Sequence, residues 1–247
     1  MSSSEAREWI GKDALGEPTV NVRCVTLEVV LQRHRSATKS PPGITFSPMA
    51  TWTPSARKYV ESRGITSEQV ERWGIGHGFA GRFAGRIVFP KRSPSGELLG
   101  WSARTFIGDR KRYLEATAQE APNASAAIFG EQHWPTKERR RLFLTEGAIN
   151  ALAVERVVKP ANGWPEDVGR GIGAISGANL HTIQAVKLGT WEEVVVVSDP
   201  DAAGDRLAEE VAGLFGRSRT KMLRARLPDG VDAADASPKL LAEVIGL

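Results

Sequence analysis

Apolar and polar residues alternate in regular blocks along the second half of the chain, from residue 141 to the end. Short apolar runs of strand length are followed by segments in which apolar residues recur every three or four positions, the spacing of an amphipathic helix. The pattern predicts strands over 141–145, 172–176, 194–198 and 220–227, and helices over 147–157, 179–187, 202–215 and from 237 onward. Because strands and helices alternate, we expect an α/β fold with a small parallel sheet flanked by helices.

The preceding part of the chain has a different pattern. Residues 53–73 carry the start and stop signals of two short helices, and 86–91 and 97–103 read as the strands of a hairpin around a proline- and glycine-containing turn. These elements predict a smaller α+β subdomain before the parallel sheet. We therefore expect the chain to have three parts. Residues 1–52 form a segment of unknown role and a linker, 53–140 form a basic α+β subdomain, and 141–247 form the parallel-sheet domain.

Composition narrows the class of protein. Cys24 is the only cysteine, which excludes disulfides and a cysteine-based zinc site. No apolar run approaches the roughly 18 residues of a membrane span, and the amino-terminus lacks the apolar segment of a signal peptide. We expect a cytoplasmic protein.

Charge is distributed unevenly along the chain. Residues 82–141 carry 12 basic and 6 acidic side chains, a net charge of +6, whereas 142–247 carry 11 and 15, a net charge of −4. A basic surface beside a carboxylate cluster suits a protein that holds a phosphate backbone next to a metal site. Chance clustering on a solvated surface would give the same composition.

Acidic residues follow the most apolar predicted strand. Four consecutive valines, 194–197, lead into Ser198, Asp199, Pro200 and Asp201, and ligands of open α/β folds bind at the carboxyl ends of strands. Two carboxylates one residue apart form a hard-oxygen pair suited to Mg²⁺. The structural alternative is that Asp201 caps the following helix.

Two further strand ends carry acids. Glu146 ends the strand that begins at 141, where Gly147 is expected to let the chain turn sharply into a helix. The stretch after the last strand offers Asp229, Asp232 and Asp235. If the strands starting at 141 and 194 are neighbours, Glu146 and Asp199 converge at one sheet edge. One acid at a strand end is commonplace, whereas three strand ends with acids are not.

These motifs resemble a known family. Three motifs resemble those of the TOPRIM domain: Glu-Gly at 146–147, Asp-x-Asp-x-Ala-Gly at 199–204 and Leu-Pro-x-Gly-x-Asp at 227–232. Four upstream stretches resemble the RNA-polymerase core of TOPRIM primases of the bacterial DnaG type and occur in the same order as in that family. They are RGITSEQVERWGIG, GRIVFPKRSPSGELLGWSAR, KRYL and IFG. The resemblance covers roughly residues 55–247.

The resemblance implies a function and a site. It implies a DNA primase, a nucleotidyltransferase that makes short RNA primers from ribonucleoside triphosphates on single-stranded DNA by two-metal chemistry with Mg²⁺, or Mn²⁺, and no zinc. The implied catalytic metal ligands are Glu146, Asp199 and Asp201, with Asp232 as a further ligand. The implied nucleotide- and template-binding residues are Arg86, Arg104, Lys111, Arg112 and Tyr113. With no zinc module or helicase domain recognisable, we expect a phage- or mobile-element-like core that works with a separately encoded helicase.

Three positions depart from the family pattern. The aspartate four residues after the family's glutamate is Asn150, the second aspartate of its last acidic motif is Ala234, and the asparagine of its Lys-Tyr-Leu-Asn stretch is Glu115. They keep open a catalytically weak or inactive primase-like protein that binds single strands. A TOPRIM nuclease is a further alternative, although the stretch 85–114 would be unnecessary for it. A phosphatase of the haloacid-dehalogenase class is disfavoured because its Asp-x-Asp pair usually opens the fold.

Overall fold

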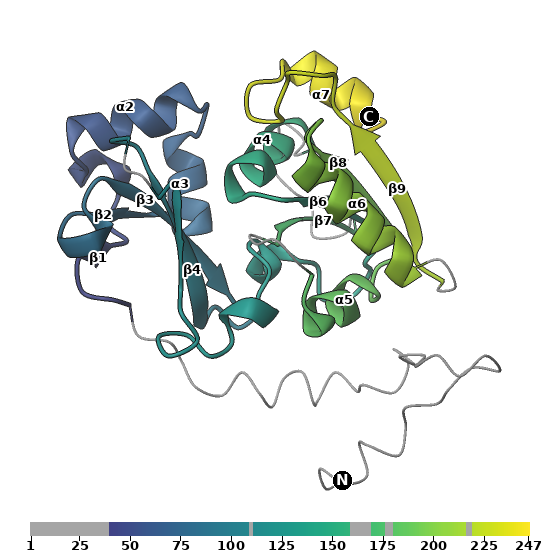
Figure 1. Ribbon diagram of the computed structural model, residues 1–247, viewed down its shortest axis with the longest axis horizontal. Helices are drawn as coiled ribbons and strands as arrows, with labels where there is room; N and C mark the ends of the chain where they lie inside the picture. Colours follow the sequence, from purple (N-terminus) through teal and green to yellow (C-terminus); the bar gives the residue numbers. More distant parts are fainter. Residues whose placement is uncertain (1–39, 109–110, 159–168, 176–179, 216–218) are drawn as a thin grey trace, which may run out of the picture. The chain divides into compact units, whose positions relative to one another are not determined.

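The computed structural model describes residues 40–247 apart from 109–110, 159–168, 176–179 and 216–218. Most of the segment of unknown role, residues 1–39, therefore lies outside the described residues. The described chain contains a five-stranded antiparallel sheet and a four-stranded parallel sheet (Figure 1). This arrangement confirms the expected α/β fold class. Across the described ranges, no helix combines the length and apolar character needed to cross a membrane.

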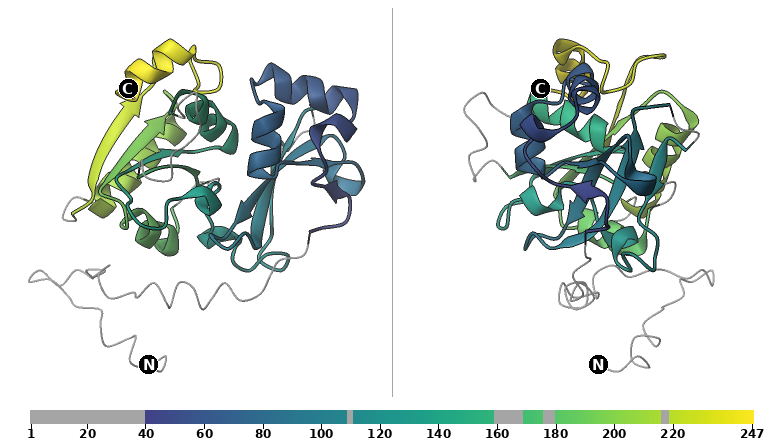
Figure 2. Two further views of the ribbon diagram at one scale, coloured as in Figure 1. Left: turned by 180° about the vertical axis from the view of Figure 1, so that it is seen from behind. Right: turned by 90° about the vertical axis from the view of Figure 1, so that its left-hand side faces the viewer.

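The parallel sheet has the strand order β7-β6-β8-β9. Its strands are β6 (Arg141–Thr145), β7 (Arg170–Ala174), β8 (Glu193–Ser198) and β9 (Lys221–Arg226), and its helices are α4 (Ala148–Val158), α5 (Thr182–Leu188), α6 (Ala202–Phe215) and α7 (Pro238–Val244). Strand β6 pairs in parallel with β8, as predicted, so the two strands end at the same sheet edge. Figures 1 and 2 show β9 as an outer strand beside β8.

Both faces of the two central strands are covered by helices. Phe143, Val195 and Val197 belong to one buried cluster with the apolar side chains of α4 and α7. Leu142, Leu144, Val194 and Val196 belong to a second cluster with α5 and α6. Successive strand residues point to opposite faces, so a strand buried on both sides must be apolar at every position. The valine run of β8 is the sequence signature of this burial.

The antiparallel sheet has the order β1-β2-β3-β4-β5. Its strands are β1 (Ile44–Thr45), β2 (Gly76–Gly78), β3 (Arg86–Arg92), β4 (Leu98–Thr105) and β5 (Tyr113–Glu115), and its helices are α2 (Pro54–Ser62) and α3 (Ser67–Trp73). The predicted hairpin is β3–β4, and the capping box of Thr66 and Gln69 is present at the start of α3. Short 3-10 helices occur at η2 (Met49–Thr51), η3 (Gly81–Phe83), η4 (Ala124–Ala126) and η5 (Glu131–His133).

Three strands of this sheet are missing from the sequence prediction. Strands β1, β2 and β5 have only two or three residues, too few to show a period of two. Strand β1 pairs with β2, so part of the stretch expected to be a linker belongs to the sheet. The predicted domain boundary at 140/141 remains a prediction.

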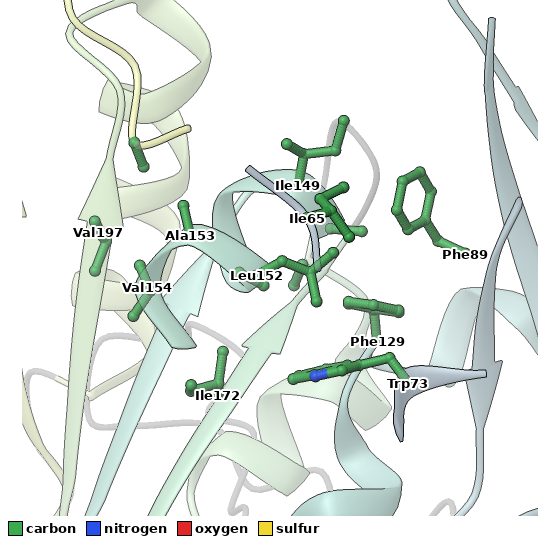
Figure 3. Close-up of a cluster of buried hydrophobic side chains, with 14 of the residues drawn as sticks. Ile65, Trp73, Phe89, Phe129, Ile149, Leu152, Ala153, Val154, Ile172 and Val197 are labelled. Atoms are coloured by element: carbon green, nitrogen blue, oxygen red, sulfur yellow. The ribbon is translucent and has the colours of Figure 1, made fainter. Parts of the chain in front are cut away.

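Helix α3 packs against α4 around one buried carboxylate. Glu155, 1% exposed, accepts hydrogen bonds from Gln69 Nε2 at 2.8 Å and from Trp73 Nε1 at 2.7 Å. Trp73 also stacks on Phe129, with 4.8 Å between ring centroids. Figure 3 shows Trp73 and Phe129 together, with Leu152 of α4 in the same cluster. These contacts join the antiparallel sheet's helices to the parallel-sheet layer.

Candidate active site

A cavity of about 770 Å³ opens at the carboxyl ends of the central parallel strands. Its walls include the four acids that the sequence singled out and three arginines: Glu146, Asp199, Asp201, Asp232, Arg104, Arg112 and Arg206. Tyr113, Glu115 and Asn150 also line it. The structure thus brings together carboxylates from three strand ends and arginines from the antiparallel-sheet region and from helix α6.

The chain turns tightly between β8 and α6, and this turn places the Asp-x-Asp pair. Asp201 Oδ1 accepts hydrogen bonds from the backbone N–H groups of Ala203 at 3.0 Å and Gly204 at 2.8 Å, so Asp201 does cap the helix. A Cβ atom on Gly204 would lie 2.3 Å from the carbonyl oxygen of Asp199, so only glycine fits there. Helix capping occupies one carboxylate oxygen of Asp201 and fixes the direction of the side chain.

The chain turns from β6 into α4 without a left-handed backbone angle at Gly147. The φ angle of this glycine lies outside the left-handed range, and a Cβ atom there would approach only the Tyr113 hydroxyl, at 4.0 Å. The turn after β6 is instead bridged by Thr145, whose hydroxyl donates to the carbonyl of Gly147 at 3.0 Å. A Cβ atom at position 147 would make only an ordinary van der Waals contact, so an alanine would also fit there.

Asp199 is held from two sides. Its Oδ2 accepts a hydrogen bond from Asn150 Nδ2 at 2.7 Å, and its Oδ1 accepts one from the backbone N–H of Ala233 at 3.2 Å. Asn150 comes from α4, and Ala233 comes from the loop after β9. One carboxylate therefore anchors segments that follow three different strands.

The carboxylates carry more negative charge than the cavity easily accommodates. Burial raises the pKa of Glu146, and the charges of Asp201 and Asp199 raise it further, while Arg206 and Arg112 oppose the shift. Burial also raises the pKa of Asp199; the Ala233 and Asn150 hydrogen bonds counter this, whereas Asp232 and Asp201 add to it. Carboxylates that repel one another in a cavity are a common sign of a cation-binding or catalytic site.

The donor set fits a hard divalent cation. Glu146, Asp199, Asp201 and Asp232 supply carboxylate oxygens, which Mg²⁺ and Mn²⁺ prefer, and the raised pKa values show that a positive charge would be favourable here. Among the residues that the structure describes, however, no three acidic, histidine or cysteine side chains are close enough to enclose one ion. Side-chain rotation, or ligands from water and substrate, would be needed to complete the coordination.

Arg104 and Tyr113 form a pair in the cavity wall. Arg104 Nη1 donates to the Tyr113 hydroxyl at 2.7 Å, and its guanidinium lies 5.3 Å from the centre of the tyrosine ring. Burial raises the pKa of Tyr113, so the phenol stays neutral at physiological pH. Together with exposed Arg112, the pair presents positive charge beside the carboxylates.

Two predicted binding residues lie outside this cavity lining. Arg86 is only 1% exposed, and its guanidinium donates to the backbone carbonyls of Ala103 at 3.3 Å and Lys111 at 2.9 Å. It ties β3 to β4 and to the segment before β5. Lys111 is exposed and does not line the cavity. The structure gives Arg86 a supporting role behind the predicted basic surface.

The departures from the family pattern have local explanations. Glu115 lies 3.3 Å from Nζ of Lys91, whose side chain is 4% exposed, so it neutralises a buried lysine. Ala234 packs against the apolar cluster of α4 and α7. Its neighbour Asp235 lines the cavity and forms an ion pair with Arg63 at 3.3 Å.

Arg206 is a candidate site residue that the sequence prediction missed. It lies on the face of α6 that also presents Ala203, Leu207 and Glu210 to the cavity, a spacing of three and four residues. Arg224 and Arg226 on β9 pair with Asp205, whereas Arg206 has no hydrogen-bond or ion-pair partner in the described ranges. The helical period after Asp201 was the available signal.

Comparisons with known proteins give a consistent result. A family model described as Toprim-like matches residues 143–237. A DNA primase of Halalkalibacterium halodurans is 24% identical over 227 residues, covering 76% of this chain and 36% of that protein. A DNA primase of Thermotoga maritima is 31% identical over 153 residues, covering 59% of this chain and 25% of that protein. The chain thus spans about a third or less of these relatives.

Solved structures share the fold. The RNA polymerase domain of Mycobacterium tuberculosis primase DnaG matches with a TM-score of 0.64 and 18% identity, covering 81% of this chain and 79% of that one. The Escherichia coli primase catalytic core matches with a TM-score of 0.59 and 21% identity, covering 76% and 69%. A DnaG primase catalytic domain bound to single-stranded DNA has a TM-score of 0.63 and 20% identity, covering 81% and 72%.

Proposed function

We propose that this chain, a TOPRIM-type core of the DnaG primase kind, joins ribonucleotides into short RNA primers on a single-stranded DNA template. The observation that carries the proposal is the cavity in which Glu146, Asp199 and Asp201 face Arg104, Arg112 and Arg206. Nucleotidyl transfer requires carboxylates to hold divalent cations and basic side chains to hold phosphates. The relatives named DNA primase support the same reaction class.

The acidic residues have separate tasks in this proposal. Glu146, Asp199, Asp201 and Asp232 would hold the divalent cations, Mg²⁺ or Mn²⁺. When bound, such cations lower the pKa of an attacking hydroxyl and neutralise charge on the reacting phosphate and the leaving pyrophosphate. Asn150 keeps Asp199 oriented, and helix capping keeps one oxygen of Asp201 fixed. The residues are thus oriented before the substrate arrives, which reduces the reorganisation needed during reaction.

The basic residues bind substrate in this proposal. Arg112 and Arg206 lie close enough to the acidic cluster to lower the pKa of Glu146, so they can contact the phosphates of a nucleotide held there. Arg104 and Tyr113 form the next part of the wall, where template or nucleotide base would lie. Single-stranded DNA and ribonucleoside triphosphates are the proposed substrates, and a separately encoded helicase is a proposed partner.

The test is primer synthesis by the full chain on single-stranded DNA with labelled ribonucleotides and Mg²⁺ or Mn²⁺. We expect short RNA products from the wild type and a loss of at least roughly 100-fold in Asp199→Ala/Asp201→Ala. The matched control is Glu209→Ala/Asp229→Ala, which removes two exposed carboxylates outside the cavity lining and should leave synthesis unchanged.

Two other outcomes would decide against primase activity. If both wild type and variant bind single strands equally and neither makes RNA, the chain is a binding module on a primase fold. If the wild type cleaves the single-stranded DNA and makes no RNA, and the Asp199→Ala/Asp201→Ala variant does neither, the site belongs to a TOPRIM nuclease.

A further inference from the structure

A second cavity, of about 700 Å³, lies at the opposite edge of the parallel sheet. Its lining includes Arg140, next to the start of β6, and Arg170, the first residue of β7, whereas the carboxylates follow the ends of β6 and β8. A strand of five residues at about 3.3 Å per residue puts about 15 Å between the two edges. The described lining residues of the two cavities do not overlap.

The second cavity is positively charged. Arg72, Lys137, Arg140 and Arg170 line it, together with two carboxylates, Glu138 and Glu155. Arg72 pairs with Glu155 at 3.4 Å, and Arg140 pairs with Glu138, so both acids already have cationic partners. Within the ranges that the structure describes, Lys137 and Arg170 have no carboxylate at ion-pair distance. Two positive charges are therefore left to face a ligand.

The positive charge of Arg72 also acts on a neighbouring histidine, His133. Burial lowers the pKa of His133 to about 4, and the charge of Arg72 contributes to that shift. His133 lines the cavity and is neutral at physiological pH, and its Nε2 atom lies 3.2 Å from Nε2 of Gln132. The lining thus combines net positive charge with a neutral polar ring.

We infer that this cavity binds a phosphate-bearing ligand of nucleotide size, with Lys137 and Arg170 as its phosphate contacts. Lysine and arginine are the side chains that recognise phosphate. A volume of about 700 Å³ exceeds what inorganic phosphate needs and falls in the range of pockets for small organic ligands. The ligand is either a free nucleoside phosphate or the terminal nucleotide of a nucleic-acid strand, because both carry the same group. This site does not depend on primer synthesis.

The experiment measures binding to the full chain in EDTA, which suppresses metal-dependent binding at the carboxylate cavity. The two probes are a fluorescent ATP analogue and a labelled 5′-phosphorylated single-stranded oligonucleotide, each followed by fluorescence anisotropy. We expect the Lys137→Glu/Arg170→Glu variant to bind at least one probe at least roughly tenfold more weakly than the wild type, because each substitution removes a charge-assisted contact with phosphate.

The matched control is Lys58→Glu/Lys239→Glu, which makes the same change in net charge at two exposed lysines outside both cavities. Loss of the ATP analogue alone identifies a free-nucleotide site, and loss of the oligonucleotide identifies a strand-end site. If neither probe binds in EDTA, or if both variants weaken binding equally, the inference is wrong. The milder Lys137→Gln/Arg170→Gln variant repeats the test if the glutamate variant does not fold.

Discussion

Asn150 Nδ2 donates a hydrogen bond to Asp199 Oδ2 at 2.7 Å. Position 150 is an aspartate in the family that this chain resembles. The amide holds the carboxylate without adding a negative charge to a cavity that seven acidic residues already line. The departure from the family pattern is therefore compatible with a working site. It also predicts how the site responds to a restored carboxylate.

We expect Asn150→Asp to destabilise the metal-free protein by about 1 kcal/mol, because a hydrogen bond is replaced by repulsion between two carboxylates. Mg²⁺ should then raise the melting temperature of this variant more than that of the wild type. Thermal denaturation in EDTA and in Mg²⁺ measures both effects. Asn150→Ala removes the donor without adding charge, and an equal Mg²⁺ response in Asn150→Asp and Asn150→Ala would contradict the explanation.

Gly204→Ala should lower stability by roughly 2 kcal/mol and reduce primer synthesis, because the added Cβ would clash with the backbone of Asp199. Gly213 provides the matched control on the same helix, since a Cβ there would meet nothing within 4 Å. Gly213→Ala should stabilise the protein by about 0.5–1 kcal/mol through its higher helix propensity. Chemical denaturation compares the two, and a neutral Gly204→Ala would show that the turn can relax.

Glu146 should make the metal-free protein less stable as pH rises. Its pKa is raised in the folded state, so its contribution is most favourable below the ordinary value of 4.5 and is lost as pH rises through the folded pKa. Glu146→Gln should therefore be more stable than the wild type at pH 7 in EDTA, and the difference should shrink at pH 4.5. Urea denaturation at both pH values checks this. A Glu146→Gln variant less stable than the wild type at pH 7 would mean that other contacts dominate.

His133 should change the pH dependence of stability in the opposite direction to Glu146, making the protein less stable as pH falls. Its pKa is lowered from 6.5 to about 4, so the stability contributed by the neutral ring is present above 6.5 and is lost as pH falls toward 4. We expect the stability difference between the wild type and His133→Asn to decrease by about 2–3 kcal/mol between pH 7.5 and 4. Denaturation of both proteins across that range measures the difference. A constant difference would place the ring in a more solvated environment.

Lys91 and Glu115 should be energetically coupled. The lysine is buried, and the glutamate carboxylate lies 3.3 Å from its ammonium group. We expect Glu115→Gln to cost more in the wild type than in a Lys91→Met background, with a coupling free energy of about 1 kcal/mol. A double-mutant cycle by chemical denaturation gives the value directly. Additive effects would leave Glu115 without a structural explanation.

The order of elements in the parallel-sheet domain could be predicted from the sequence because burial leaves a local signature. Strand β8 is apolar from Val194 to Val197 since both of its faces are covered there, and α6 shows the helical period that follows from covering one of them. The acids at the strand ends could be assigned to one edge because parallel strands end together. That reasoning assigned Glu146, Asp199 and Asp201 to one sheet edge, the family resemblance added Asp232, and the structure shows all four in one cavity.

Contacts between distant segments could not be predicted in this way. The Asn150–Asp199 bond, the burial of Arg86 and the exposure of Arg206 to the cavity depend on how helices and loops pack after the sheet has formed. Strands β1, β2 and β5 exist through pairing with longer neighbours, since two or three residues carry no period of their own. The sequence determined the elements and the acidic edge because periodicity and strand direction are local properties. Only the tertiary structure decided which side chains support the site, because that depends on distances between residues far apart in the chain.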